Sequence, residues 1–567
     1  MTIMRALSYL HVLLIMLIMH PVSAQVQFDF SDEAVVNRLT EDVYTLASDE
    51  MEGREAGTEG ERKAAAYIKM RMQEIGLQPM FGESFYQEFP FPGDWLWGED
   101  NTLAIGDISF VHGEDYHVLP GSASGFFSLP FVDVGFGLTN LEVDGFEDYC
   151  DYAGLEDIEG KLFLMEFYVP EELDTLADRR IFQLLFQKVR TAQEKGAAGI
   201  VFVNSKSERD DPPVDLRMSR SGFEMPVLFV GQEAHRALLE NSPEELSMEV
   251  NIYREELTAI NVAGYIDNQA ERTVVIGAHY DHIGYGGRGS RSPGERVIHP
   301  GADDNASGTA GVLEAARYIS HSTLDQHNYI FIAFSAEEKG LIGSRYFTDS
   351  DAYNIEHINY MFNLDMIGRL EDNSLTIIGT GTSPQWDELI DQHAPEHLVI
   401  RKSPTGRGGS DHTSFYLKDI PVLFFFTGVH EDYHRPGDTA DKVNYEGARE
   451  ITYLALDMVR SLDAMDRLAF TRSSAPAAER PQRGTVVLGL MPDHAYEGEG
   501  MRVLSVTDDQ PAFHAGMQNG DVILRINDMP VAEIYTYMEA MGSLSSGALV
   551  TVVVKRGEEE HTLEVQL

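Results

Sequence analysis

The sequence has little cysteine, few basic residues for its acidic ones, and almost no long hydrophobic run. Cys150 is the only cysteine among 567 residues, so the chain forms no internal disulfide and no cluster of thiolates. The 43 lysines and arginines are outnumbered by 92 aspartates and glutamates, and the formal charge at pH 7 is −49. A chain of that sign repels nucleic acid and anionic lipid, so we expect neither as a partner.

The one markedly apolar stretch stands near residue 1. Arg5 precedes an apolar run at 7–19, and residues 22–24 (Val-Ser-Ala) form a small-residue cleavage site. The run is too short to span a bilayer comfortably, and no later run is long enough to do so. We therefore expect residues 1–24 to be a signal peptide, with no membrane insertion and with export to the periplasm or the medium.

What the sequence does have, beyond residue 256, is a series of apolar runs separated by helical patterns. The runs cover 274–277, 329–334, 360–364, 375–378 and 422–426. Such runs predict strands buried on both faces of a mixed, mostly parallel sheet that helices cover, which is an α/β fold. Helices are predicted at 33–46, 58–75, 307–320, 384–393 and 444–463.

Changes in residue pattern divide the chain into domains. The predicted units are an α/β domain at 25–118 and 256–465, a β-rich module inserted at 119–255, a linker at 466–482, and a β-rich C-terminal domain at 483–567. The inserted module combines short β-like runs with one helix near 181–195. The linker is predicted because its Arg, Ser, Ala, Pro and Gln residues show no apolar period.

Side chains that bind metals cluster in five places. Four clusters follow predicted strands, and the fifth lies in a loop that opens a helix: His279-Tyr280-Asp281-His282, Glu337-Glu338, Asp365, Tyr433-His434 and Asp303-Asp304. In α/β sheets, ligand sites gather at the carboxyl ends of the strands. One sheet could therefore bring all five clusters together.

The residue types indicate metal-assisted hydrolysis. Imidazoles and carboxylates without thiolate are typical zinc ligands, and their number exceeds what one tetrahedral ion requires. The set suits two adjacent ions that share a carboxylate. Of Glu337 and Glu338, one could be a ligand and the other a general base. Asp281 is spaced to hold the second imidazole nitrogen of His279.

Other polar residues near these clusters are given structural interpretations. The additional histidines are interpreted as structural or surface residues, and they are His282, His299, His412 and His430. Ser410-Asp411-His412 has the residue types of nucleophilic catalysis. No Gly-x-Ser-x-Gly elbow supports a serine mechanism, however.

These motifs resemble metallopeptidase family twenty-eight, the co-catalytic zinc exopeptidases that include leucyl aminopeptidases and the glutamate carboxypeptidase II group. The resemblance covers about 30–118 and 256–465, with five motifs in the family's order. They are Gly277-Ala278-His279-Tyr280-Asp281-His282, Gly301-Ala302-Asp303-Asp304-Asn305-Ala306-Ser307-Gly308, Ser335-Ala336-Glu337-Glu338, Asn363-Leu364-Asp365-Met366-Ile367-Gly368 and Tyr433-His434.

The resemblance implies a role for each residue. It makes Asp303 the carboxylate that bridges two Zn²⁺ per chain, with His279 and Asp365 completing one site and Glu338 and His434 the other. Glu337 is then the general base. Asp281 stands behind His279, Tyr433 helps bind the oxyanion, and the peptide bond from Asp303 to Asp304 is expected to be cis.

Two further resemblances concern the other domains. The insert resembles a protease-associated (PA) domain through Asp151-Tyr152-Ala153-Gly154-Leu155, Gly160-Lys161, Lys195-Gly196-Ala197-Ala198-Gly199-Ile200 and Met225-Pro226-Val227. The C-terminal domain resembles a bacterial protease PDZ domain through Pro511-Ala512-Phe513-His514-Ala515-Gly516-Met517 and Asn519-Gly520-Asp521-Val522-Ile523. Leu488-Gly489-Leu490 would be its carboxylate-binding loop, for a C-terminal peptide or a protein ligand.

The sequence therefore predicts a secreted zinc metallopeptidase, most simply an aminopeptidase acting on peptide substrates. A glutamate-type carboxypeptidase shares the metal site but needs a cation for the substrate carboxylate, and Arg407 is one candidate. A glutaminyl cyclase shares the fold but works with a single zinc. An inactive receptor-like homologue would have lost ligands, and no predicted ligand is missing here.

Overall fold

The computed structural model describes residues 28–567, with gaps. The gaps are at 106–107, 140–148, 171–184, 186–187, 206–210, 212–222, 242, 288, 293–295, 474–487, 494–495, 497, 507–509, 528, 532–535, 538–539, 542–543, 545–546 and 558. The predicted signal peptide, much of the predicted helix near 181–195, and most of the predicted linker lie outside the described residues. None of the helices in the described part is long and apolar enough to cross a membrane.

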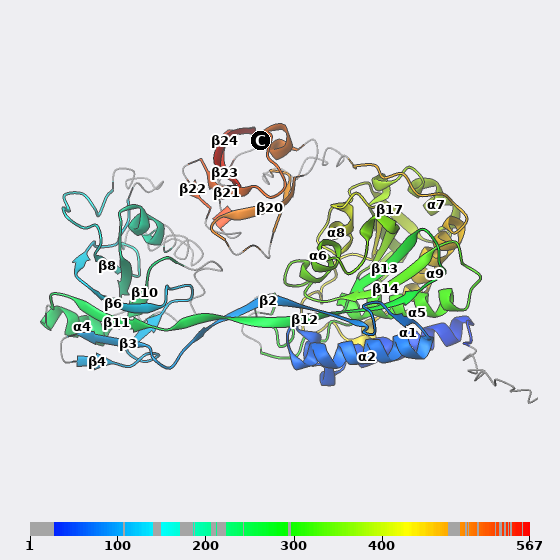
Figure 1. Ribbon diagram of the computed structural model, residues 1–567, viewed down its shortest axis with the longest axis horizontal. Helices are drawn as coiled ribbons and strands as arrows, with labels where there is room; N and C mark the ends of the chain where they lie inside the picture. The colour runs from blue at the N-terminus through cyan, green and yellow to red at the C-terminus, as the bar shows by residue number, and fades with distance from the viewer. Residues whose placement is uncertain are drawn as a thin grey trace, which may run out of the picture.

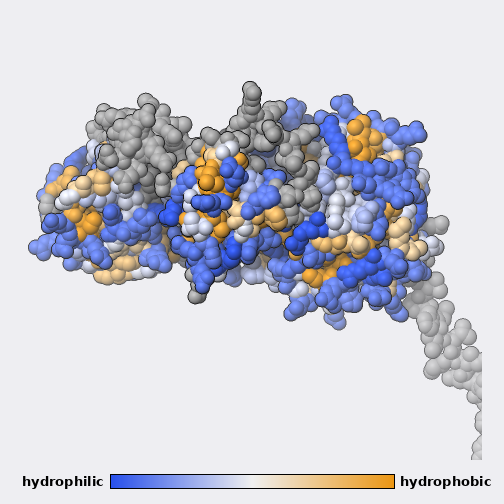
Figure 2. All heavy atoms as spheres, turned by 90° about the horizontal axis from the view of Figure 1, so that it is seen from above, coloured by the Kyte–Doolittle hydropathy of each residue, from blue (hydrophilic) through white to orange (hydrophobic). Residues whose placement is uncertain are grey.

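Figure 1 shows three units along one axis. A helix-covered sheet forms the unit that carries the predicted metal-binding clusters, which we call the catalytic unit. A long two-stranded ribbon leads from it to the insert, and the C-terminal domain lies between the catalytic unit and the insert. Seen from above, hydrophilic residues predominate on the described surface and apolar residues form scattered patches (Figure 2).

The catalytic unit is built on one mixed sheet. Its strand order is β1-β12-β14-β13-β15-β18-β16-β17, and β2 pairs with β12. The bounds are β1 Gln78–Pro79, β2 Tyr86–Trp97, β12 Ile252–Ile266, β13 Thr273–His279, β14 Asn328–Phe334, β15 Ile358–Leu364, β16 Ser374–Ile378, β17 Val399–Ser403 and β18 Val422–Phe426. The four central strands β14, β13, β15 and β18 are mutually parallel. The predicted α/β fold and its mostly parallel sheet are confirmed.

Helices cover both faces of this sheet. They are α1 Asp32–Leu46, α2 Glu59–Ile75, α5 Gly308–Ser320, α6 Ile342–Asp349, α7 Trp386–His393, α8 His412–Tyr416 and α9 Tyr445–Leu462. Along β13, Val274 and Ile276 pack in the core with α1, α2, α5 and α9, while Val275 packs with residues of α6 and α8. Alternate side chains thus enter two apolar cores, which is why these strands read as continuous apolar runs.

The two-stranded ribbon of β2 and β12 is more regular than the sequence indicates. Residues 86–108 are rich in Gly and aromatics and predict irregular strands, yet β2 is one strand paired along most of its length with β12. The pairing slips once, between Arg254 and Glu256. Strand β12 reaches both cores, because Ile252 is buried in the insert and Val262 in the catalytic unit.

The insert begins earlier in the chain than predicted. Its sheets have the orders β5-β10-β9-β8-β7 and β4-β3-β11-β6. The bounds are β3 Thr102–Ile105, β4 Ile108–Phe110, β5 Tyr116–Val118, β6 Gly125–Leu129, β7 Phe131–Asp133, β8 Leu162–Glu166, β9 Gly199–Val203, β10 Val227–Val230, α4 Gln232–Asn241 and β11 Leu246–Val250. Strands β3, β4 and β5 pair within these sheets, although the predicted boundary at residue 119 assigns them to the α/β domain.

The C-terminal domain is a small β-rich unit with its own apolar core. Its strand order is β19-β20-β21-β23-β24, with β22 beside β21. The bounds are β19 Leu490–Pro492, β20 Met501–Val506, α10 Pro511–His514, β21 Val522–Ile526, β22 Met529–Pro530, β23 Leu549–Arg556 and β24 Glu559–Gln566.

The start of the predicted linker belongs to the catalytic unit. Leu468 is buried in the catalytic core, and its backbone N–H donates to Asn359 Oδ1 at 2.8 Å. Ser473 Oγ accepts from the Gly406 N–H at 2.9 Å. Residues Leu468 and Ser473 are therefore anchored to the catalytic unit.

Candidate active site

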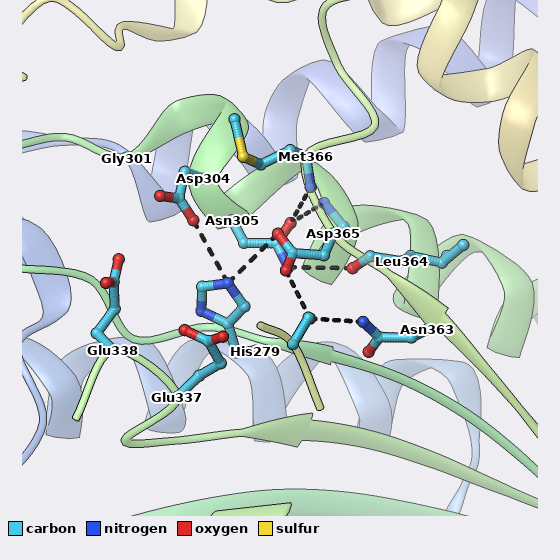
Figure 3. Close-up of polar contacts among 12 residues, drawn as sticks. His279, Gly301, Asp304, Asn305, Glu337, Glu338, Asn363, Leu364, Asp365 and Met366 are labelled. Carbon is cyan, nitrogen blue, oxygen red and sulfur yellow. Dashed lines mark hydrogen bonds and ion pairs between the residues drawn. The ribbon is translucent and has the colours of Figure 1, made fainter. Parts of the chain in front are cut away.

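The sheet topology brings the predicted clusters to one place. His279 ends β13, Glu337 and Glu338 follow β14, Asp365 follows β15, and β18 leads toward His434. Since these strands are parallel, their carboxyl ends lie at the same edge of the sheet. Figure 3 shows His279 between Asp304, Asp365 and Glu337, with Glu338 beside Asp304.

The first potential metal site centres on the His279 imidazole. Its Nε2 lies 3.4 Å from Asp304 Oδ1 and 3.4 Å from Asp365 Oδ1. Its Nδ1 lies 3.1 Å from the Asp281 backbone oxygen, which can accept the Nδ1–H and leave the Nε2 lone pair facing the carboxylates. That orientation suits a metal ligand.

The second potential site uses the other oxygen of Asp304. His434 Nε2 lies 3.2 Å from Asp304 Oδ2 and 3.2 Å from Glu338 Oε2. His434 Nδ1 lies 2.8 Å from the Gly289 backbone oxygen. As in His279, Nδ1 therefore faces a backbone oxygen and Nε2 faces the carboxylates. Asp304 therefore stands between the two groups, with one oxygen toward each.

His282, interpreted from the sequence as a structural or surface residue, lies beside this site. Its Nδ1 lies 2.8 Å from Glu338 Oε1 and 3.7 Å from Asp304 Oδ2, and the ring is fully buried. In the sequence, His282 stands three residues after His279, in the loop that follows β13.

The structure corrects the prediction for Asp303. Its Oδ1 accepts from the Gly368 N–H at 2.6 Å and from Ser307 Oγ at 3.0 Å. Its Oδ2 faces His430 Nε2 at 3.3 Å, away from His279 and His434. The cis peptide joins Asp304 to Asn305, one residue later than expected. Adjacent acids point in different directions, and the one that reaches both groups is Asp304.

A further carboxylate holds the backbone on which this geometry depends. Asp438 Oδ2 accepts from the N–H groups of both Asp303 and Asp304, each at 3.0 Å, while Oδ1 pairs with Arg369. Asp438 is fully buried. The sequence analysis did not single it out.

Asp281 acts on the loop after β14 as well as on His279. Its carboxylate accepts from the Glu337 N–H at 3.1 Å and the Glu338 N–H at 3.4 Å. Oδ1 is 3.7 Å from His279 Nδ1, farther than the Asp281 backbone oxygen. Asp281 thus links the imidazole to the two glutamates, which the sequence spacing indicated only in part.

The charges in the site shift the pKa values strongly. Burial and the neighbouring charges of Glu338 and Asp411 raise the pKa of Glu337 well above its usual range, against the attraction of His279. Burial and Asp304 would raise the pKa of Glu338, but hydrogen bonds to His282 and His434 lower it to about 2. A raised pKa makes a carboxylate a stronger base. Of the two adjacent glutamates, Glu337 has the raised pKa.

The residues fit zinc ions. Ligands about 2.0–2.1 Å from a tetrahedral zinc lie roughly 3.3–3.4 Å from one another, which matches the separations around His279 and His434. Asp304 Oδ2 and Asp365 Oδ1 are buried and make no hydrogen bond. The two candidate groups are His279, Asp304 and Asp365, and His282, Asp304 and Glu338.

Three parts of the chain match the models of known protein families. Residues 261–459 match the family model of peptidase family M28, 130–238 that of the PA domain, and 480–567 that of the PDZ domain.

Residues 261–459 are an M28 peptidase domain.

Two curated relatives of this chain are aminopeptidases. Aminopeptidase YwaD of Bacillus subtilis is 25% identical over 403 residues, which are 69% of this chain and 77% of that protein. An aminopeptidase of Pseudomonas aeruginosa is 24% identical over 434 residues, covering 72% and 74%. A solved zinc aminopeptidase from Bacillus subtilis aligns with 78% of this chain and 98% of its own, at 22% identity and a TM-score of 0.44. The family model and the two curated relatives indicate a peptidase.

Tyr433 lies against the second group of the M28 site. Its ring stacks on His434 with centroids 3.9 Å apart, and the Arg291 guanidinium lies 4.6 Å from the Tyr433 ring centroid. Burial and the charges of Asp304 and Glu338 raise the pKa of the phenol far above its usual range. The hydroxyl therefore keeps its proton and can donate a hydrogen bond.

Ser410 supports a ligand and does not form a nucleophilic triad. Its Oγ donates to Asp365 Oδ2 at 2.6 Å and accepts from Asn363 Nδ2 at 2.7 Å. His412 stacks on Phe424 and neither of its ring nitrogens makes a hydrogen bond. Burial lowers the pKa of His412 to about 3. The structural interpretation of this segment fits these contacts.

Arg54 is a support of the M28 site that the sequence analysis missed. Its fully buried guanidinium donates to the backbone oxygens of Tyr280 at 2.7 Å, Pro300 at 2.7 Å and Gly301 at 2.8 Å. These oxygens belong to the loops that carry His279 and Asp304. Burial lowers the pKa of Arg54 to about 10, while Asp304 and other nearby carboxylates oppose that shift.

Proposed function

We propose that this protein is an exported aminopeptidase that removes N-terminal residues from peptides with two zinc ions per chain. The observation that carries the proposal is Asp304, whose two oxygens face two imidazole–carboxylate groups. We assign His279 and Asp365 to one ion, and Glu338 and His434 to the other. His282 holds Glu338 through Nδ1. Secretion rests on the signal-peptide pattern of residues 1–24.

The chain's own residues supply the proton transfers. Zinc ions bound here would polarise the scissile carbonyl and lower the pKa of a water molecule. Glu337 takes a proton from the attacking water as the oxygen bonds to the carbonyl carbon. It then gives that proton to the leaving amine as the peptide C–N bond breaks. Tyr433 donates a hydrogen bond to the developing oxyanion.

The acidity of the site favours a free N-terminus as the substrate end. Glu337, Glu338, Asp304 and Asp365 lie around His279 in Figure 3, and a carboxylate of this cluster that is not neutralised by a bound ion can attract an ammonium group. The carboxypeptidase alternative requires a cation for the substrate carboxylate. Arg407, the candidate for that cation, has its guanidinium 5.6 Å from the Tyr416 ring centroid.

Peptides that differ only at their ends test this proposal. We expect rapid hydrolysis of a peptide with a free N-terminus, whether its C-terminus is free or amidated, and no hydrolysis of its N-acetylated form. Mass spectrometry of the products shows which end is trimmed, and a chelator should stop the reaction. Release of C-terminal glutamate from the acetylated peptide would establish the carboxypeptidase instead.

We also propose that the C-terminal domain binds the carboxylate end of a peptide at Leu488-Gly489-Leu490. Among the described residues β19 pairs only with β20, so one edge of β19 can accept an added strand. Gly489 has φ +76°, and a Cβ there would lie 2.0 Å from Gln510 Cβ. Only glycine allows this loop to turn its N–H groups toward a carboxylate.

Binding of labelled peptides to the full chain tests the loop. A peptide with an apolar last residue should bind with its carboxylate free and not when amidated, as measured by fluorescence anisotropy. Gly489→Ala should weaken binding by roughly tenfold. Gly520→Ala is the matched control, since Gly520 has φ +86° with open space around it. Equal binding of both peptide forms would contradict carboxylate recognition.

A further inference from the structure

The C-terminal domain contacts the catalytic unit through a buried ion pair. Asp493 directly follows β19, and its side chain is 1% exposed. Arg345 of α6 places Nη1 at 2.9 Å from both carboxylate oxygens. Arg502 of β20 donates to Oδ2 from Nε at 2.8 Å and from Nη2 at 2.5 Å. One carboxylate thus joins an arginine of each unit.

Arg345 also contacts the loop that carries the active-site glutamates. Its Nη2 donates to the Gly340 backbone oxygen at 3.0 Å. The N–H groups of Gly340 and Leu341 donate in turn to the Glu337 backbone oxygen, at 2.8 and 2.9 Å. A chain of hydrogen bonds therefore runs from Asp493 to Glu337.

Helix α6 is held on more than one side. Tyr346, next to Arg345, stacks on Phe89 of β2 with centroids 5.2 Å apart. The C-terminal domain meets the insert too, where Arg190 Nη1 lies 3.4 Å from the Leu524 backbone oxygen. The domain is therefore placed by contacts with both of its neighbours, between which it lies in Figure 1.

We propose that Arg345 and Asp493 are positioning residues for hydrolysis, through which the docked C-terminal domain fixes the loop from Glu337 to Gly340. This inference rests on the proposed role of Glu337 as the base. Without Asp493, Arg345 loses both carboxylate contacts and keeps only the one to Gly340. Without Arg345, a buried carboxylate loses a partner and the loop loses a donor. Neither substitution replaces a proposed zinc ligand.

Kinetics of variants in the full chain test the proposal. We would compare Arg345→Met, Asp493→Asn and the double variant on a dipeptide amide, which lacks the free carboxylate that Leu488-Gly489-Leu490 is proposed to bind. We expect each single variant to lower kcat by about tenfold, because displacements near 1 Å in an active site can cost as much as 10²-fold. KM and the zinc content should change little. The double variant should lose no more than a single one, since both remove the same interaction.

Lys418→Met is the matched control. Lys418 Nζ pairs with Asp349 Oδ1 at 2.6 Å at the far end of the same helix, and it forms no ion pair with the described residues of the C-terminal domain. It should have normal kcat. Normal kcat in Arg345→Met and Asp493→Asn, or losses that multiply in the double variant, would overturn the proposal. So would equal losses in Lys418→Met.

The same assay separates this inference from the proposed function. If the unaltered chain does not hydrolyse the amide but releases C-terminal residues, the aminopeptidase assignment fails. The variants are then compared on that carboxypeptidase substrate, because Glu337 would be the base in either reaction.

Discussion

Replacing Glu337 by Gln should lower kcat by about 10²–10⁴-fold, the usual contribution of a general base, and leave the zinc content unchanged. Glutamine keeps the size of the side chain and cannot accept the proton of the attacking water. Glu337 belongs to neither group of candidate ligands, so its replacement removes no metal contact. Steady-state hydrolysis of a dipeptide amide gives kcat, and elemental analysis gives the zinc content.

Glu338→Gln is the matched control for this result. Glu338 Oε2 lies 3.2 Å from His434 Nε2, so this neighbour should lose zinc along with activity. The two results together would assign the role of base to Glu337 and that of zinc ligand to Glu338. Near-normal kcat in Glu337→Gln would show that another group takes the proton.

Replacing Asp304 by Asn should remove detectable hydrolysis and most of the bound zinc. Among the described residues, Asp304 is the one carboxylate that forms an ion pair with both His279 and His434, and asparagine offers only a single, neutral oxygen. Zinc should fall from about two ions per chain to one or none. Titration with a coloured chelator measures both the number of ions and their affinity.

Asp303→Asn distinguishes the corrected assignment from the original one. The amide of the substituted side chain would keep an oxygen to accept from Gly368 and Ser307, so both zinc ions should remain and thermal stability should change modestly. If Asp303→Asn loses both ions while Asp304→Asn keeps them, then Asp303 is the bridge after all.

The sequence predicted the catalytic fold well because burial on both faces leaves a strong signal. Val274, Val275 and Ile276 are consecutive and apolar since neighbours on β13 enter opposite cores. Because these strands are parallel, the residues that follow them lie at one edge of the sheet. His279, Glu337, Glu338, Asp365 and His434 were placed together for that reason.

Features that depend on side-chain direction could not be predicted in this way. Asp303 and Asp304 are identical in type and adjacent, and only the turn of their backbone decides which one faces His279 and His434. Arg54 binds backbone oxygens, which any sequence supplies, so no partner residue indicates its role. The contact of Arg345 with Asp493 joins residues that are far apart in the chain, in two separate units.

The continuous strand β12 couples the stability of the insert to that of the catalytic unit. Ile252 is part of the insert's core and Val262 part of the catalytic core, with an unbroken strand between them. Unfolding the insert would free Ile252 and fray β2 away from β12, which is paired with β14 in the central sheet. The two units should therefore melt as one cooperative transition. The C-terminal domain has a separate core, and none of its described strands belongs to the sheets of either unit, so it can unfold by itself.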